Sequence, residues 1–400
     1  MTASVAAGVD ELVDRLLEDL PPERTPPQEF LGAQYDRGLA WVHFPTDCGG
    51  LGLTPRDQQR VQQRLHAGGA PVAGVKNPIG YGMCAPTIVS HGTDEQKRRY
   101  LRPLFTSEEI WCQLFSEPGS GSDVAGLSTR AVLDGDEWVL NGQKVWTTLA
   151  HISKFGLLLA RTNPDVPKHR GMTAFLIDMT LPGVEVRPLF QITGEAEFNE
   201  VFFSDVRMPD AARIGAEGDG WRVAVTTLMN ERVSIGGAVT RRGGGPIAEA
   251  IRIWKERWSG NTSPQALALR DRLMSSWIRC EVISMTNQRA SQQRRSGTPG
   301  PEGSVGKLAF AEENQRVYNL CMDLLGNDGM LFPAGYPMIR PDLVGMGSTD
   351  PHKMFLRVRA NSIEGGTSEV MRNILGERVL GLPGDARSDK DVAWKDVPRS

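Results

Sequence analysis

Residues 113–123 read Gln-Leu-Phe-Ser-Glu-Pro-Gly-Ser-Gly-Ser-Asp, and the character of the sequence changes at this stretch. The stretch combines small residues, hydroxyl groups and free backbone N–H groups, so a flat heteroaromatic ring or a phosphate can approach the backbone closely. It contains no Walker pattern and completes no Rossmann glycine motif. Its composition alone leaves two interpretations open, a ligand-binding loop and a flexible surface turn.

The sequence before this stretch predicts a helical N-terminal domain over residues 1–110. Apolar residues recur at helical spacing from Val9 to Leu20 and again from Pro55 to Leu101. Breakers such as Gly80 divide the pattern into separate helices.

From residue 111 to residue 213 the pattern changes to short alternating runs, which predict an antiparallel β-barrel domain. Phe155–Ala160 and Met172–Ile177 are two of these runs. Asn141-Gly142 predicts a hairpin turn, because both residue types accept the positive φ angles of a type I′ turn.

Helical spacing returns after Gly218-Asp219-Gly220 and predicts a helical bundle over residues 214–385. Thr367 or Ser368 is suited to cap its last helix. Residues 386–400 are charged and poor in large apolar side chains, so we expect a flexible tail there.

Composition narrows the class of protein. The 400 residues are 40% hydrophobic and 23% charged, which fits two or three domains sharing a large core. The formal net charge of -3 gives no overall attraction to nucleic acid or to an anionic membrane. The five cysteines form no CxxC pair, so they predict neither a disulfide framework nor a zinc site and suit a cytoplasmic protein. No apolar run is long enough to span a bilayer, and we expect neither export nor membrane insertion.

Three segments, in this order and spacing, resemble the acyl-CoA dehydrogenase family, including its actinobacterial type that forms mixed tetramers. They are residues 113–123, the run Asn-Gly-Gln-Lys-Val-Trp-Thr-Thr at 141–148, and Glu-Gly-Gly-Thr-Ser-Glu at 364–369. The similarity extends over residues 30–383. It implies a mainly α fold with a helical N-terminal domain, a β-barrel middle domain and a C-terminal four-helix bundle. FAD would lie between the last two domains and extend to a neighbouring subunit, which implies a dimer or a tetramer.

The resemblance also implies which residues hold the ligands. The residues at flavin-binding positions are Gln113, Phe115, Ser116, Gly121, Ser122, Trp146, Thr148, Gly326 and Thr367. Ser122 would also face the pantetheine or a phosphate of the substrate, and Arg232 and Gly365 are further substrate-binding candidates. The alternative for Trp146 is a residue of the barrel core.

The implied reaction needs a base. The Cα hydrogen of a thioester is weakly acidic, so its removal requires an aligned carboxylate and hydrogen-bond donors for the developing enolate oxygen. In much of the family the base directly precedes the Gly-Thr-Ser of the C-terminal motif, but Gly365 occupies that position here and Glu364 lies one residue earlier. The Gly365 backbone N–H could still donate to the thioester oxygen.

The other family location for the base is a helix of the C-terminal bundle, where this sequence has Glu231. Glu231 shares one helical stripe with Leu228 and Ile235, which predicts that it points toward the interior. An unpaired glutamate is costly there, which favours a functional reason. The alternative is a buried salt bridge to Arg232 or Arg242. We therefore assign Glu231 as the base, with Glu364 as the second candidate.

Two segments depart from the family pattern at positions that reach the FAD of the adjoining subunit. They are Lys255–Ser259 and Asp323–Gly329, and a carboxylate such as Asp323 would repel a pyrophosphate. Similar departures occur in family members that work as mixed tetramers with fewer flavins than subunits. Residues 339–353 are an insertion relative to the short form of the family.

The sequence thus predicts an FAD-dependent α,β-dehydrogenation of an acyl-CoA to the trans-2-enoyl-CoA, with electrons passed to an external electron-transfer flavoprotein. Two alternatives remain open: a non-catalytic partner subunit of a mixed tetramer, and an oxidase or monooxygenase on the same scaffold. A base on the bundle helix permits branched, long or polycyclic acyl groups in the family.

Overall fold

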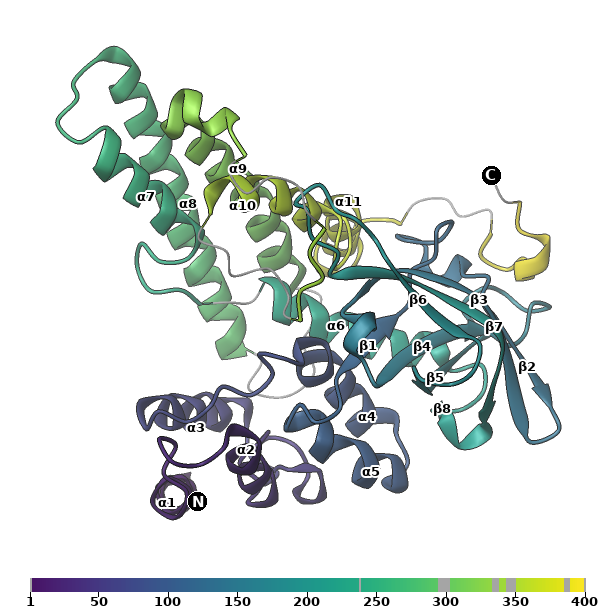
Figure 1. Ribbon diagram of the computed structural model, residues 1–400. Coiled ribbons are helices and arrows are strands. Elements are labelled where there is room, and N and C mark those ends of the chain that lie inside the picture. The colour runs from purple at the N-terminus through teal and green to yellow at the C-terminus, as the bar shows by residue number, and fades with distance from the viewer. Residues whose placement is uncertain are drawn as a thin grey trace.

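The computed structural model describes residues 2–236, 239–293, 303–332, 338–342, 350–384 and 389–398. Figure 1 shows the N-terminal helices grouped together, the β-sheet beside them, and the long C-terminal helices extending away from the sheet. In the part of the chain that is described, no helix combines the length and the hydropathy needed to cross a bilayer.

The N-terminal part is helical, as the sequence predicts. Its α-helices are α1 (Thr2–Asp19), α2 (Pro27–Asp36), α3 (Pro55–Ala67), α4 (Ala85–His91) and α5 (Asp94–Phe105). Thr54 and Thr93 start α3 and α5 with capping boxes, in which the side chain and the third residue of the helix bond each other's backbone N–H. The buried side chains of α4 and α5 join the same core cluster as Trp111 and Leu157 of the sheet. Helices α4 and α5 therefore connect the N-terminal part to the middle domain.

The middle part is a single mixed sheet. Its strands are β1 (Trp111–Leu114), β2 (Arg130–Asp134), β3 (Glu137–Thr148), β4 (Phe155–Arg161), β5 (Met172–Asp178), β6 (Val184–Pro188), β7 (Phe198–Pro209) and β8 (Arg213–Ile214). They follow the order β6-β7-β3-β2-β4-β5-β8, with β1 paired to β4.

The expected closed, antiparallel barrel is wrong in two respects. The strand order is an open path that ends at β6 and β8, and the β1–β4 and β2–β4 pairs are parallel. Strands β2 and β4 are joined through one residue pair, Arg130 with Arg161, so the sheet is loosely connected at its centre. Alternating runs predict strands, but they do not fix whether the two edge strands meet.

The predicted hairpin at Asn141-Gly142 is also wrong, because both residues lie inside β3. The turn between β2 and β3 lies at Gly135, which has a φ of 67°. Gly142 instead sits at a register shift between β3 and β7, with a φ of 151°. A Cβ there would lie 2.5 Å from Thr129 Oγ1, so the glycine permits a close approach of two backbones.

The C-terminal part is helical and is organised around one helix. The α-helices are α6 (Gly220–Gly236), α7 (Pro246–Arg257), α8 (Pro264–Gln293), α9 (Gly303–Leu325), α10 (Pro351–Arg357) and α11 (Ser368–Ile374). Helix α9 contacts all five of the others. The Thr367 side chain caps α11 by accepting a hydrogen bond from Val370 N at 3.2 Å, as expected.

Two segments outside these helices return to the sheet. Ile339, in the described part of the insertion, pairs its backbone with Gly194 and Ala196 beside β7, whereas residues 343–349 lie outside the described residues. The last described residues, 389–398, lie against the loop before β2. The sequence indicates a flexible tail in this region, whereas in the structure Ala393 pairs with Pro167 and the Trp394 indole N–H donates to the Gly126 carbonyl of the middle domain.

Candidate active site

Glu231 lies where three parts of the chain meet. Helix α6 contacts α4 of the N-terminal part, β4 and β5 of the sheet, and α9. The Glu231 carboxylate accepts a hydrogen bond from the Gln113 side chain of β1, with 3.4 Å between the nitrogen and oxygen atoms. In the described chain this is its single hydrogen bond, and no ion pair to Arg232 or Arg242 is formed. The alternative, a buried salt bridge between Glu231 and Arg232 or Arg242, is therefore wrong.

Gly365 lies beside this carboxylate. A Cβ built on Gly365 would be 3.5 Å from Glu231 Oε1 and only 2.8 Å from Ile235 Cδ1. The residue also has a φ of 64°, which favours glycine. A side chain at position 365 would therefore strain the backbone, displace the end of Ile235 and lie in van der Waals contact with the Glu231 carboxylate.

The surroundings of Glu231 suit a base. Burial raises the pKa of Glu231 above the ordinary carboxyl value, and the negative charge of Glu364 acts in the same direction. The hydrogen bond from Gln113 and the positive charges of Arg232 and Lys307 oppose this shift without cancelling it. A carboxylate with a raised pKa binds a proton more strongly than one in water, which is what removal of a weakly acidic hydrogen requires.

Lys307 of α9 is a buried cation beside this group, and sequence reasoning missed it. Its side chain is fully buried, and its ammonium donates to the carbonyl oxygens of Asn361, at 2.9 Å, and of Gly366. The Cβ that Gly365 lacks would lie 3.6 Å from Lys307 Cε. Burial lowers the pKa of Lys307, while Glu364 and Glu231 favour its charged form. Lys307 therefore holds the 361–366 loop in place and also brings a positive charge near Glu231.

Glu364 has different partners. Its carboxylate pairs with Arg357 at 3.1 Å and accepts a hydrogen bond from Asn361 Nδ2 at 2.6 Å. Arg357 is itself buried and forms a second ion pair, at 3.3 Å, with the fully buried Glu197 next to β7. Glu364 thus belongs to a network that joins the C-terminal domain to the sheet. Its oxygens are engaged there rather than presented beside Gly365.

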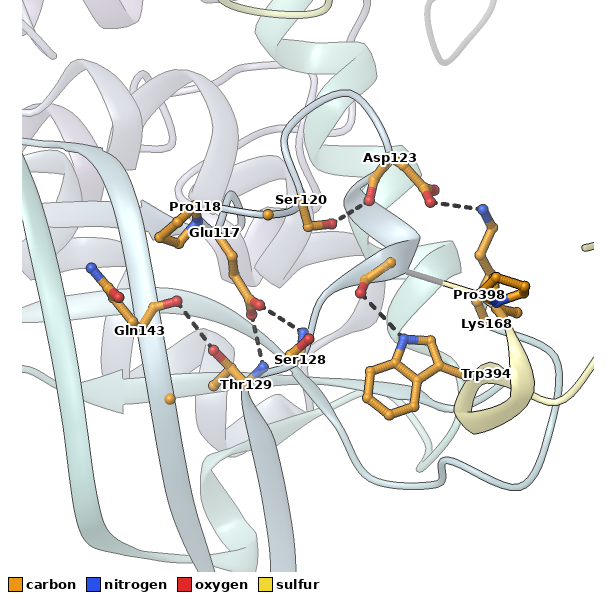
Figure 2. A pocket seen from close by; sticks show the side chains of 14 residues that line it. Glu117, Pro118, Ser120, Asp123, Ser128, Thr129, Gln143, Lys168, Trp394 and Pro398 are labelled. Atoms are coloured by element: carbon orange, nitrogen blue, oxygen red, sulfur yellow. Dashed lines mark hydrogen bonds and ion pairs between the residues drawn. The ribbon is translucent and has the colours of Figure 1, made fainter. Parts of the chain in front are cut away.

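A second buried ion pair shapes the loop at residues 113–123. Lys144 of β3 donates to Glu117 Oε1 at 2.8 Å and to the Phe115 carbonyl at 3.0 Å, and both charged side chains are buried. Glu117 also accepts from the backbone N–H groups of Ser128 and Thr129 (Figure 2). Burial would raise the pKa of Glu117, but the Lys144 charge and these hydrogen bonds lower it below the ordinary value. The loop is therefore fixed at its base and is not a free surface turn.

The tip of this loop is open. Gly121 and Ser122 are exposed, and a Cβ added at Gly119 or Gly121 would meet no atom within 4 Å. Ser116 fastens the start of the loop to β3, because its carbonyl accepts from Val145 N at 2.9 Å. The exposed part of the loop is thus confined to residues near its tip, while Glu117 and Ser120 are buried.

Trp146 of β3 is the most unusual of the predicted flavin-binding residues. It has a φ of 61°, its ring is 60% exposed, and it touches the edge of Phe198 at 6.0 Å between ring centroids. A positive φ is rare for a bulky residue and is retained where the surroundings enforce it. The interpretation of Trp146 as a core residue is therefore wrong, and the exposed ring is available to a planar ligand.

The remaining predicted residues lie in four different settings. Thr148, at the end of β3, and Thr367, at the start of α11, are partly buried. Phe115 is 3% exposed and its ring packs in the core. Its backbone carbonyl accepts a hydrogen bond from Lys144. Gly326 lies past the far end of α9, about 28 Å along the helix from Lys307, and is not brought to the same site. Arg232 follows Glu231 on α6, and burial lowers its pKa.

Comparison with known proteins identifies a family for the whole chain. Family models of acyl-CoA dehydrogenases match in three parts: the N-terminal domain over residues 1–108, the middle domain over 112–206 and the C-terminal domain over 218–380. The acyl-CoA dehydrogenase IpdE1 of Mycobacterium tuberculosis is 38% identical over 353 residues, which cover 88% of this chain and 86% of that protein. The chain belongs to the acyl-CoA dehydrogenase family.

Solved structures of this family share the whole fold. The Tcur3481-Tcur3483 steroid ACAD superimposes with a TM-score of 0.72 at 24% identity, covering 96% of this chain and 99% of that one. The ChsE4-ChsE5 complex from Mycobacterium tuberculosis gives a TM-score of 0.69 at 29% identity, with the same coverage. The chain is therefore a flavoprotein enzyme of the acyl-CoA dehydrogenase family, and FAD is its cofactor.

The residues present fit FAD. The exposed Trp146 ring offers a flat surface, and the exposed backbone at Gly119, Gly121 and Ser122 offers N–H groups to polar or phosphate oxygens. Both features lie on segments that the Lys144–Glu117 ion pair joins.

Proposed function

We propose that this acyl-CoA dehydrogenase removes the α-proton of an acyl-CoA thioester with Glu231 and yields the trans-2-enoyl-CoA. The observation that carries the proposal is the contrast between the two candidate carboxylates. Glu231 is partly buried, bonded by a single amide and free of ion pairs among the described residues, whereas Glu364 is engaged by Arg357 and Asn361.

Each protein group has a role in this scheme. Glu231 accepts the proton at a carboxylate oxygen, and the Gln113 amide holds that carboxylate in position. Gly365 N–H, which has no acceptor in the described chain, donates to the thioester oxygen as negative charge develops there. Lys307 keeps the backbone around Gly365 in place. Bound FAD supplies the acceptor for the hydride that leaves the β-carbon, and Trp146, Thr148 and the 116–122 loop would hold it.

We also propose that an external electron-transfer flavoprotein takes up the electrons, and that the acyl group is branched, long or polycyclic. A direct test is to purify the chain, identify its released flavin by mass spectrometry, and add a panel of acyl-CoAs under anaerobic conditions. Bleaching of the flavin by one class of acyl-CoA supports the proposal and names the substrate class. A parent protein that binds FAD but bleaches with no member of the panel contradicts it.

A specific observation favours a second candidate, a partner subunit in a mixed tetramer. Asp323 pairs with Arg272 at 2.6 Å, and Asp328 pairs with Arg257 at 2.7 Å, so internal ion pairs occupy the segments that depart from the family pattern. An arginine engaged in this way is less available to a pyrophosphate of an adjoining subunit. Co-expression with related acyl-CoA dehydrogenase chains, followed by mass measurement of the complex, separates a mixed assembly from a homo-oligomer.

A further inference from the structure

The C-terminal segment, residues 389–398, returns to the loop that precedes β2. Trp394 is its main contact: its indole N–H donates to the Gly126 carbonyl at 3.2 Å (Figure 2). The Trp394 backbone N–H donates to the Val166 carbonyl at 2.9 Å. Lys395 N donates to the Pro164 carbonyl at 3.1 Å. These bonds join the end of the chain to two separate loops of the middle domain.

Charged side chains reinforce this contact. Lys168 is 7% exposed, and its ammonium pairs with Asp123, at 2.8 Å, and with Asp389 of the segment. Burial opposes the charge on Lys168, but the two carboxylates together raise its pKa above the ordinary value. One buried cation thus connects the last residue of the 113–123 loop to the C-terminal segment.

Arg161 of β4 provides a third connection. Its buried guanidinium donates to the carbonyls of Ala125, at 2.6 Å, and Leu127, at 3.3 Å, and lies 4.8 Å from the centre of the Trp394 ring. The short helix η3 (Val124–Gly126) is therefore held between Arg161 on one side and Trp394 on the other. A cation over an indole ring is attractive, and more so where water is excluded.

The contacts of Lys168, Arg161 and Trp394 involve residues 123–127, at the end of the 113–123 loop and directly after it. A cavity of about 520 Å³ lies between the loop and the segment, lined on one side by Glu117, Ser120 and Asp123 and on the other by Trp394, Val397 and Pro398. Ser120 itself bonds the Asp123 carbonyl, so movement at Asp123 is passed on to the glycine-bearing tip. The loop has the Lys144–Glu117 pair at its first end and the C-terminal segment at its second.

We propose that the C-terminal segment is a clasp that holds the 117–129 loop in its cofactor-binding shape, with Trp394 as a positioning residue for FAD. The inference rests on the proposed role of this loop in holding FAD. Without the clasp, the loop would lose the contacts that fix Asp123 and Gly126, and binding FAD would have to order it first. The clasp therefore acts on cofactor affinity and leaves the chemistry at Glu231 unchanged.

The test compares Trp394→Ala, Trp394→Phe and Lys395→Ala in the full-length chain. Lys395 is the matched control, because its side chain makes an exposed ion pair with Asp165 and its backbone bond survives the change. FAD affinity is measured by titrating each apoprotein, and amide hydrogen exchange is followed in peptides that cover residues 117–129. We expect Trp394→Ala to weaken FAD binding at least fivefold and to speed exchange in that region. Trp394→Phe keeps a ring near Arg161 but loses the bond to Gly126, so its affinity should lie between those of Trp394→Ala and the parent, and Lys395→Ala should match the parent.

Anaerobic bleaching at saturating FAD separates affinity from chemistry. The clasp predicts that the loss of bleaching in Trp394→Ala at limiting FAD is relieved as FAD is raised toward saturation. Unchanged FAD affinity in Trp394→Ala and in a chain ending at Gly384 would overturn the proposal, as would a loss of affinity with no change in exchange at residues 117–129. A parent chain that binds FAD but is bleached by no acyl-CoA would instead contradict the proposed reaction and leave the clasp intact.

Discussion

Glu231 and Glu364 are carboxylates of the same domain, but their partners give them different properties. Glu231 faces an amide and a glycine, whereas Glu364 faces a buried arginine. Removing the negative charge therefore has a different consequence at each position. At Glu231 it removes the proposed base, and at Glu364 it removes one arm of a structural network.

The first prediction compares the two amide variants. Glu231→Gln keeps the shape of the side chain and should retain FAD, but loses about 10²–10⁴-fold in the rate of anaerobic flavin bleaching, because a positioned base is gone. Glu364→Gln should bleach within a few-fold of the parent rate. Stopped-flow absorbance of the flavin measures both. If Glu364→Gln is the slower variant, the base assignment is wrong although the family membership is unaffected.

The second prediction concerns pH and Lys307. The base must be ionised to act, so the bleaching rate should rise with pH through the pKa of Glu231, which lies above the ordinary carboxyl value. Lys307 opposes that shift, and the other charges near Glu231 are Glu364 and Arg232. Lys307→Met should therefore move the midpoint of the pH profile upward, while Lys307→Arg, which keeps the charge, should move it less. An unchanged midpoint in Lys307→Met would show that its charge does not act on the base.

The same raised pKa has a consequence for stability. A carboxyl group whose pKa is higher in the folded state stabilises that state when protonated, and this contribution is lost as pH rises through the folded pKa. Glu231→Gln should therefore raise the melting temperature relative to the parent near neutral pH, and the gain should shrink in acid below the pKa of an unfolded glutamate. Thermal unfolding of the apoprotein across this pH range checks the sign.

At the scale of elements, Lys144 and Glu117 join strand β3 to the flavin loop. Removing one member of a buried ion pair leaves the other charge in a poor environment and typically costs about 3–5 kcal/mol. Lys144→Met should lower the free energy of unfolding by an amount of this order and weaken FAD binding as well. The double variant Lys144→Met with Glu117→Gln should recover part of the stability, because it leaves no buried charge. Denaturant unfolding of the four proteins in this cycle gives the coupling energy.

The sequence predicts where helices and strands occur better than it predicts which strands pair with each other. The stripe that places Glu231 inward and the cap at Thr367 depend on neighbouring residues, and both are confirmed. Asn141-Gly142 could not be assigned correctly from local preferences, because the same two residues suit a turn and a register shift inside a strand. Local pattern likewise predicts strands without showing whether the sheet closes.

Much of the site depends on residues that are far apart in the chain. Lys307 meets Gly366 across 59 positions, and Arg357 meets Glu197 across more than twice that distance. A single sequence gives no signal for either contact, since a lone lysine or arginine is usually solvated. Their burial could be recognised only when the helices and the sheet were placed together.

At the scale of the molecule, α8 presents a row of apolar side chains away from its buried face. Leu267, Met274, Ile278, Val282 and Met285 are each more than 40% exposed. An exposed apolar row of this kind on a long helix is typical of an interface between subunits.

We therefore predict a dimer or tetramer, with no stable monomer at micromolar concentration in sedimentation experiments. Ile278→Glu should shift the equilibrium toward monomers, because association would bury an unpaired charge. Gln265→Glu adds the same charge to α8 outside the row and should leave the assembly intact. An active monomer that retains FAD would contradict the prediction.

The contacts and the backbone angle of Gly365 restrict which side chains position 365 can hold. A glutamate at position 365 would enter the volume beside Ile235, bring a second negative charge close to the first, and adopt a backbone angle that suits glycine. Placing the base at position 365 of this chain would therefore require matching changes at Ile235 and in the local backbone, in addition to the new carboxylate.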